Sequence, residues 1–193
     1  MSDAKKVSKK DNMSMKTLEL DHHWHLATNE HEIAITELEH SLIRSYEGFT
    51  RWTRECVVAS SGFNMSTHEC AILNIIAMHD RPKSTTEITR LLNRDDKSNI
   101  QYSIGKLTSY KLVEKTSTDH RRKGVRYRTT IAGNRVVKRY VSLRKELLIE
   151  LTETIRSMDG QLAAGSKILD LMSGMYDQAA RIAAIHRTTF EKE

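Results

Sequence analysis

Hydrophobic residues recur at alternating steps of three and four along the segment that starts near Glu30, with charged residues between them. This spacing predicts an amphipathic helix, because residues three and four apart share one helix face. The helix is expected to run about 28 residues to a break at Ser61-Gly62, a length of about 42 Å. One small domain cannot cover so long a stripe, so we expect a partner helix. The stripe comprises Ile35, Leu38, Leu42, Ser45, Phe49, Trp52 and Cys56.

Two capping boxes follow, Ser66-Thr67-His68-Glu69 and Ser84-Thr85-Thr86-Glu87, and each predicts the start of a short helix. After the second helix, Asn93-Arg94-Asp95-Asp96 has the composition of a turn, and Asp96 can cap the next helix. This order predicts a helix-turn-helix. The inward face of its second helix is expected to be Ile100, Ile104 and Leu107.

Two short strands, Leu112 to Ser117 and Gly124 to Thr130, are predicted on either side of the cationic segment 118–123. A hairpin directly after a recognition helix is a wing. After Gly133 the pattern predicts a helix to Met158, a break at Asp159-Gly160, and a last helix to about Phe190. That last helix has a coiled-coil-like seam at Ile168, Met172, Met175, Ala179, Ile182 and His186.

The predicted fold class is mainly α, a winged helix-turn-helix with long N- and C-terminal dimerisation helices and a small β-hairpin wing. Residues 1–16 are expected to be a flexible basic tail and 17–60 an N-terminal dimerisation helix region. Residues 61–133 would form the DNA-binding domain and 134–193 the C-terminal dimerisation helices. Long helices at both ends can pair with a second copy, so we expect a symmetric homodimer.

Charge is concentrated in one part of the 193-residue chain. Residues 81–145 hold 18 Lys and Arg against 5 Asp and Glu, while the remainder is net acidic. A basic segment within an otherwise acidic chain predicts that a polyanion binds to this segment, with affinity from contacts between basic side chains and phosphates.

Several classes of protein are disfavoured. No run approaches the roughly 20 apolar residues of a membrane span, and no signal peptide is evident, so a cytoplasmic protein without membrane contact is expected. The sequence has no phosphate-binding glycine loop, nucleophile elbow or recognisable pair of carboxylates, so we expect neither an enzyme nor a cofactor.

The chain resembles the MarR (multiple antibiotic resistance regulator) family from about residue 30 onward. The resemblance rests on residues 84–88, 97–107 and 112–115, on the wing entry Asp119-His120-Arg121, and on the wing exit Thr130-Ile131-Ala132-Gly133. It implies a homodimer on near-palindromic DNA, usually a repressor, often released by a small aromatic or phenolic ligand bound between the dimer helices and the reading heads.

Asn99 and Gln101 are the best candidates for reading bases, since either amide can pair bidentately with adenine in the major groove. Ser98 and Tyr102 can contact base or phosphate, and Lys97 and Lys106 are expected to bind phosphate. The alternative is an ordinary solvated helix face. The predicted wing contacts, which suit a narrow minor groove, are Arg121, Arg122, Lys123 and Arg126.

An effector pocket, which rests on the resemblance, is expected near the junction of the dimer helices and the reading head. Its candidate residues are Phe49, Arg51, Trp52, Met65 and His68.

Other chemistry is disfavoured. His22, His23 and His25, with His31 beyond them, could be interpreted as a metal site, but their spacing is irregular, so no metal is predicted. Cys56 and Cys70 are too few for a disulfide framework. The place of Cys56 on the apolar stripe favours an inert core thiol over a redox sensor.

The sequence thus predicts a sequence-specific DNA-binding transcription regulator, expected to be a repressor and to act as a homodimer on double-stranded DNA. The alternative is a non-specific architectural DNA- or RNA-binding protein, which would lose affinity equally for every sequence as salt rises.

Overall fold

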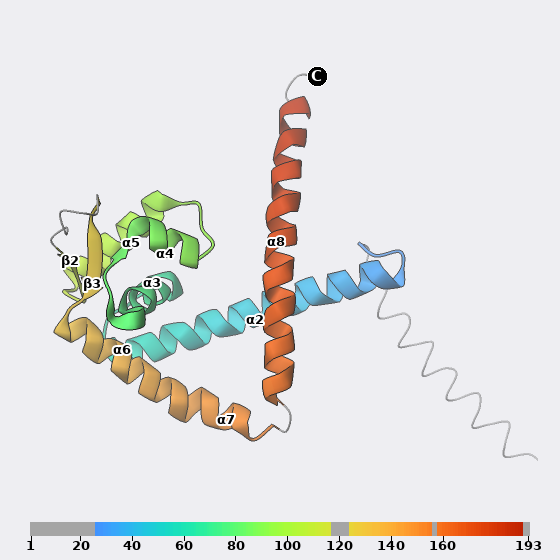
Figure 1. Ribbon diagram of the computed structural model, residues 1–193. Coiled ribbons are helices and arrows are strands. Elements are labelled where there is room, and N and C mark those ends of the chain that lie inside the picture. The colour runs from blue at the N-terminus through green and yellow to red at the C-terminus, as the bar shows by residue number, and fades with distance from the viewer. Residues whose placement is uncertain (1–25, 117–123, 156–157, 191–193) are drawn as a thin grey trace, which may run out of the picture. The chain divides into compact units, whose positions relative to one another are not determined.

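The structure is a computed structural model that describes residues 26–116, 124–155 and 158–190. The chain divides into two units, of which the first ends at Val137 and the second begins at Lys138. Figure 1 shows the first unit as a group of short helices and strands joined to the long helix α2. The predicted histidine-rich segment and the basic tail lie outside the described residues.

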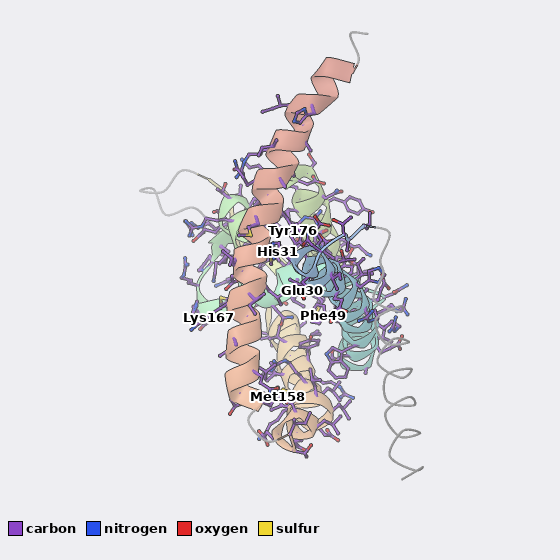
Figure 2. All side chains as sticks on the ribbon, turned by 90° about the vertical axis from the view of Figure 1, so that its right-hand side faces the viewer. Glu30, His31, Phe49, Met158, Lys167 and Tyr176 are labelled. Atoms are coloured by element: carbon purple, nitrogen blue, oxygen red, sulfur yellow. The ribbon has the colours of Figure 1, made fainter. Side chains whose placement is uncertain are left out.

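Helix α2 spans Glu30–Ser61, close to the predicted bounds. Asn29 caps its start, because the Asn29 side chain accepts a hydrogen bond from the Glu32 backbone N–H. Gly62 ends it with a φ of 72°, a left-handed conformation that glycine adopts without a steric cost. The predicted stripe is buried at Cys56, but Phe49 is 55% exposed and is labelled on α2 in Figure 2.

Both predicted capping boxes are present. Ser66 caps α3 (Thr67–Ala77) and Ser84 caps α4 (Thr85–Leu91), and in each box the glutamate three residues later accepts from the backbone N–H of the capping serine. Between them lie the short 3-10 helix η1 (Met78–Asp80) and the two-residue strand β1 (Lys83–Ser84).

Helix α5 (Lys97–Ser109) packs on α3 and α4. Its predicted inward residues Ile100, Ile104 and Leu107 are all at most 2% exposed. They contribute to a core of aliphatic side chains whose burial is the main driving force for folding this unit. The other members that are at most 2% exposed include Ile72, Ile76, Ile88, Leu112 and Val113.

The predicted hairpin is confirmed, with shorter strands than expected: β2 is Val113–Thr116 and β3 is Arg126–Thr129. They pair antiparallel, with Val113 opposite Thr129 and Thr116 opposite Arg126. β1 pairs with the other edge of β3, so the strand order is β1-β3-β2. The sequence did not predict β1, and the predicted wing tip, residues 118–123, lies outside the described residues.

The wing exit is tied back to the wing entry at Thr130. The Thr130 backbone N–H donates to the Leu112 carbonyl (3.0 Å), and its hydroxyl donates to the Lys111 carbonyl (2.7 Å). The same hydroxyl accepts from the Gly133 N–H, which caps helix α6 (Ile131–Arg144). A Cβ at Gly133 would overlap the Leu112 carbonyl oxygen, so the helix can approach the strand this closely only with glycine there.

The helices after the wing depart from the prediction. Helix α6 begins at Ile131, before Gly133, and runs into a π-helical segment, η2 (Lys145–Ile149), and then α7 (Glu150–Glu153). Helix α8 (Met158–Phe190) starts at Met158, labelled in Figure 2, and continues through Asp159 and Gly160. The predicted break there is wrong: an aspartate in the first helical turn is favourable beside the helix dipole.

We predict that Gly133→Ala lowers the free energy of unfolding by roughly 1–3 kcal/mol, because helix or strand must shift to relieve the overlap with Leu112. Gly105→Ala is the matched control, since a Cβ there meets nothing within 4 Å. In a helix interior that change should add about 0.5–1 kcal/mol. Urea unfolding followed by circular dichroism measures both, and equal stabilities for the two variants would contradict the close-approach argument.

Candidate nucleic-acid interface

The turn before α5 sets the position of the helix N-terminus. Asn93 has a φ of 50°, a left-handed conformation that asparagine tolerates better than most residues. The Arg94 N–H donates to the Thr89 carbonyl of α4 (3.0 Å). Asp96 then caps α5, its Oδ1 accepting from the Asn99 N–H at 2.9 Å. The predicted turn and the Asp96 cap are therefore confirmed.

Five of the six residues predicted to contact DNA from α5 lie on its exposed side. Tyr102 is the most prominent, with 72% of its surface exposed. Because the opposite face is buried among the aliphatic core residues, the rotation of the helix about its axis is fixed. The exposed set is Lys97, Ser98, Asn99, Gln101 and Tyr102. Their part in DNA binding stays a prediction.

The sixth residue, Lys106, has a partner within the protein. Its Nζ lies 3.0 Å from Oε1 and 3.1 Å from Oε2 of Glu69, whose side chain is 6% exposed. The hydrogen bond that Lys106 donates to Glu69 raises the pKa of Lys106. Tyr110 lies below the ammonium and stacks on Phe63, with ring centroids 4.5 Å apart. Lys106 thus joins α5 to α3, and a phosphate contact would compete with this pair.

Arg126, predicted as a wing contact, also has partners at the base of the wing. Its Nη1 donates to the Pro82 carbonyl (2.9 Å) and to Oε2 of Glu87 (3.0 Å). The other predicted wing contacts, Arg121, Arg122 and Lys123, lie outside the described residues.

Glu87 is the centre of a charged cluster that joins α4 to the wing. Besides Arg126, it accepts from Arg81 Nη1 at 2.8 Å and from the Ser84 backbone N–H at 2.9 Å. The Ser84 N–H and then Arg81 hold the pKa of Glu87 at about 2. Beside it, Lys83 is fully buried, and its ammonium donates to the carbonyls of Met78 and Arg81.

Four of the five predicted effector residues differ widely in exposure. Phe49 and Arg51 are exposed, Trp52 is partly buried, and Met65 is 1% exposed. They do not line the cavity of about 410 Å³ found near Arg81, Glu114 and Arg128.

The fifth, His68, belongs to a set of buried polar atoms that have no hydrogen-bond partner among the described residues: Thr50 Oγ1, Thr53 Oγ1 and His68 Nε2. Helices α2 and α3 meet here, since the Thr67 hydroxyl donates to the Thr50 carbonyl (3.4 Å). On its other side, His68 Nδ1 lies 3.3 Å from Arg94 Nη1. Burial, and then the charge of Arg94, lower the pKa of His68.

The two cysteines are buried free thiols in this structure. Burial raises the pKa of Cys56, and burial followed by the neighbouring Cys56 raises that of Cys70 to about 12. Both therefore remain protonated at neutral pH, which disfavours thiolate chemistry.

Among the residues that the structure describes, no group of three or more His, Cys, Asp or Glu is arranged to hold a metal ion. No helix in the described part of the chain has the length and apolar content that a bilayer crossing requires.

Residues 65–133, which we call the reading head, match the family model described as a winged helix DNA-binding domain. No curated protein sequence matches the chain.

Solved structures of three transcription regulators are similar to this chain. The transcriptional regulator BldR from Sulfolobus solfataricus is 18% identical, with a TM-score of 0.60 over 74% of this chain and 99% of its own. A mutant of MarR from E. coli complexed with operator DNA is 18% identical, with a TM-score of 0.58 over 72% of this chain and 95% of its own. A further MarR family transcription regulator is 14% identical, with a TM-score of 0.55 over 77% and 98%.

The predicted fold class is therefore confirmed. The chain is mainly helical, contains a winged helix DNA-binding domain, and has the fold of MarR-type regulators.

Glu87→Gln should lower the free energy of unfolding at pH 7 by about 2 kcal/mol, because the charged hydrogen bonds to Arg81 and Arg126 are weakened. Folding lowers the pKa of Glu87 from 4.5 to about 2, so its carboxylate stabilises the fold above pH 4.5. That contribution is lost as pH falls from 4.5 toward 2.

The difference between wild type and variant should therefore shrink over this pH range in urea titrations. Glu114→Gln is the control, since it removes an exposed pair with Arg128 worth at most about 1 kcal/mol. A gap for Glu87→Gln that stayed constant from pH 7 to pH 2.5 would contradict the role given to the carboxylate.

Proposed function

Because residues 65–133 form a winged helix DNA-binding domain, we propose that this chain is a sequence-specific transcription regulator that acts as a homodimeric repressor on near-palindromic DNA. The observation that carries the proposal is the exposed face of α5, which presents Asn99 and Gln101 beside Lys97 and Tyr102. Amide side chains can distinguish bases in the major groove, whereas a purely electrostatic binder needs only cations. A cytoplasmic location follows from this function.

The basic surplus of residues 81–145 supports double-stranded DNA as the partner. Lys97 stands at the first position of α5, where the helix dipole also favours phosphate. Lys106 and Arg126 form ion pairs with carboxylates within the protein. Their first role is therefore to make the reading head rigid, and phosphate binding is secondary.

Binding can be measured by fluorescence anisotropy on the DNA upstream of the protein's own gene and on a scrambled duplex, at two salt concentrations. Asn99→Ala should lower affinity for the specific duplex about tenfold and leave the scrambled duplex unchanged. Lys97→Ala should weaken binding to both and reduce the slope of log affinity against log salt by about one.

Ser109→Ala, at the far end of α5, is the control and should bind like wild type. Equal affinity of wild type for both duplexes, with no effect of Asn99→Ala, would favour the alternative of a non-specific architectural protein.

The proposed homodimer is supported by an apolar stripe on α8. Ile168, Met175 and Ile182 recur every seven residues and are each about half exposed, at 49%, 54% and 48%. The far side of the helix is polar, with Asp170, Asp177 and Arg181. Apolar side chains at such spacing pack against a second helix in coiled coils. Exposed apolar residues on α2, among them Phe49, offer a second stripe.

Met175→Glu should shift the protein toward monomer in light scattering at micromolar concentration, because a charge would enter the apolar contact. Ala163→Glu places the same charge on the opposite face of α8 and should leave the dimer intact. If both variants stayed dimeric, another surface would have to form the contact.

A small aromatic acid is the proposed effector, bound where α2 meets α3. The support is the set of orphaned polar atoms at Thr50, Thr53 and His68, because a buried polar group without a partner is costly and suits a polar ligand. The anisotropy assay tests this directly. Release of DNA by benzoic or hydroxybenzoic acids should be lost in Thr53→Val, which replaces the hydroxyl with a methyl group.

A further inference from the structure

We propose that Asp96 is a positioning residue for base recognition, because its carboxylate both caps α5 and holds the side-chain amide of Asn99 in one orientation. The inference rests on the proposed function and concerns the same helix. One carboxylate oxygen accepts from the Asn99 backbone N–H at 2.9 Å. The other accepts from Asn99 Nδ2. Asp96 therefore fixes the start of the helix and the side chain of its third residue together.

The orientation of the Asn99 amide follows from the chemistry of its partner. An ionised carboxylate only accepts hydrogen bonds, so it must face the NH₂ group of Asn99 and not the carbonyl oxygen. The hydrogen bond that Asp96 accepts from the Asn99 N–H lowers the pKa of Asp96, and the positive charge of Arg94 lowers it further. The carboxylate is therefore ionised at neutral pH. Asn99 is left with one N–H and its Oδ1 free.

This donor and acceptor pair matches one base edge. In the major groove adenine offers an acceptor, N7, beside a donor, the N6 amino group, whereas guanine offers two acceptors, N7 and O6. An unrestrained asparagine can direct both of its N–H groups at guanine. With one N–H held by Asp96, that arrangement is lost, and the remaining pair complements adenine.

The neighbouring Arg94 is tied to the rest of the reading head. Its positive charge lowers the pKa of Asp96, and its backbone N–H donates to the Thr89 carbonyl of α4. The Arg94 guanidinium meets His68 of α3 at 3.3 Å. With its amide held by the Asp96 carboxylate, the Asn99 side chain loses less conformational freedom on binding, which favours discrimination between bases.

The test begins with a library of duplexes randomised over their central base pairs, from which wild-type protein and Asn99→Ala each select binders. The base pair whose adenine preference disappears in Asn99→Ala is the one that Asn99 reads. Two synthetic duplexes that differ only there, adenine against guanine, are then compared by anisotropy. Asp96→Asn is the variant measured: it is isosteric and a good helix cap, but has a single acceptor oxygen.

We expect the preference of Asp96→Asn for adenine over guanine to fall roughly tenfold relative to wild type. Asp95→Asn removes the same charge one residue away and should keep the wild-type preference, even if affinity for all DNA rises. In the Asn99→Ala background, Asp96→Asn should cause no further loss of preference. A helix that only lost stability would weaken both duplexes equally, so the ratio isolates the positioning role.

If Asp96→Asn proves unstable, Asp96→Ser, which keeps a capping oxygen, decides the same question. A wild-type adenine preference in folded Asp96→Asn or Asp96→Ser would overturn the inference while leaving the proposed function intact. Failure of wild type to enrich any sequence would instead overturn the proposed function. Enrichment without any position that depends on Asn99 would overturn the assignment of Asn99, and the inference with it.

Discussion

Three side chains on one face of α5, Ile100, Ile104 and Leu107, are buried almost completely against α3 and α4. Their burial fixes both the position of the helix and its rotation about its own axis. Ser103 shares this buried face, whereas Gln101 and Tyr102 on the other side of the helix must then face solvent, so the polar face of α5 is a consequence of the core. A rotation by one residue would expose aliphatic carbons and bury amides, at a cost of several kcal/mol.

Polar contacts then fasten the same helix at both ends. Glu69 and Lys106 join its C-terminal half to α3, while Asp96 caps its first turn. The hairpin that follows is closed by Thr130 and by the near contact of Gly133 with the Leu112 carbonyl. These contacts are short-range and directional, so they define geometry more than they add stability. A reading head needs that definition, because base recognition depends on hydrogen-bond geometry.

The parts of the fold that could be predicted are those governed by local rules. Capping boxes at Ser66 and Ser84 involve residues three apart, so their signal is complete within four residues of sequence. The partners of Lys106 and Arg126 lie 37 and 39 residues away in the sequence, so no local sequence pattern indicates these contacts. Charge alone therefore predicts a DNA contact for both residues, and that contact stays a prediction.

Two other departures have separate physical origins. β1 is two residues long and exists because Lys83 and Ser84 pair with Tyr127 and Arg126 of β3, far away in the sequence, so no periodicity could show it. Asp159-Gly160 has the composition of a turn, yet α8 runs through both, since an acidic residue and a glycine are tolerated in the first turn of a helix. Composition thus predicts the interruption between α7 and α8 to within a few residues, but after Met158 and not before it.

His68 connects the two proposed sites. Its Nε2 belongs to the orphaned polar atoms where α2 meets α3, and its Nδ1 lies 3.3 Å from Arg94, whose charge acts on Asp96. A ligand that bonded Nε2 as an acceptor would hold that proton in place and leave Nδ1 to accept from Arg94. A ligand that donated to Nε2 would move the imidazole proton to Nδ1, where it would face the guanidinium and push it away. The hydrogen-bonding chemistry of a ligand at His68 Nε2 would thus decide whether His68 Nδ1 can accept from Arg94.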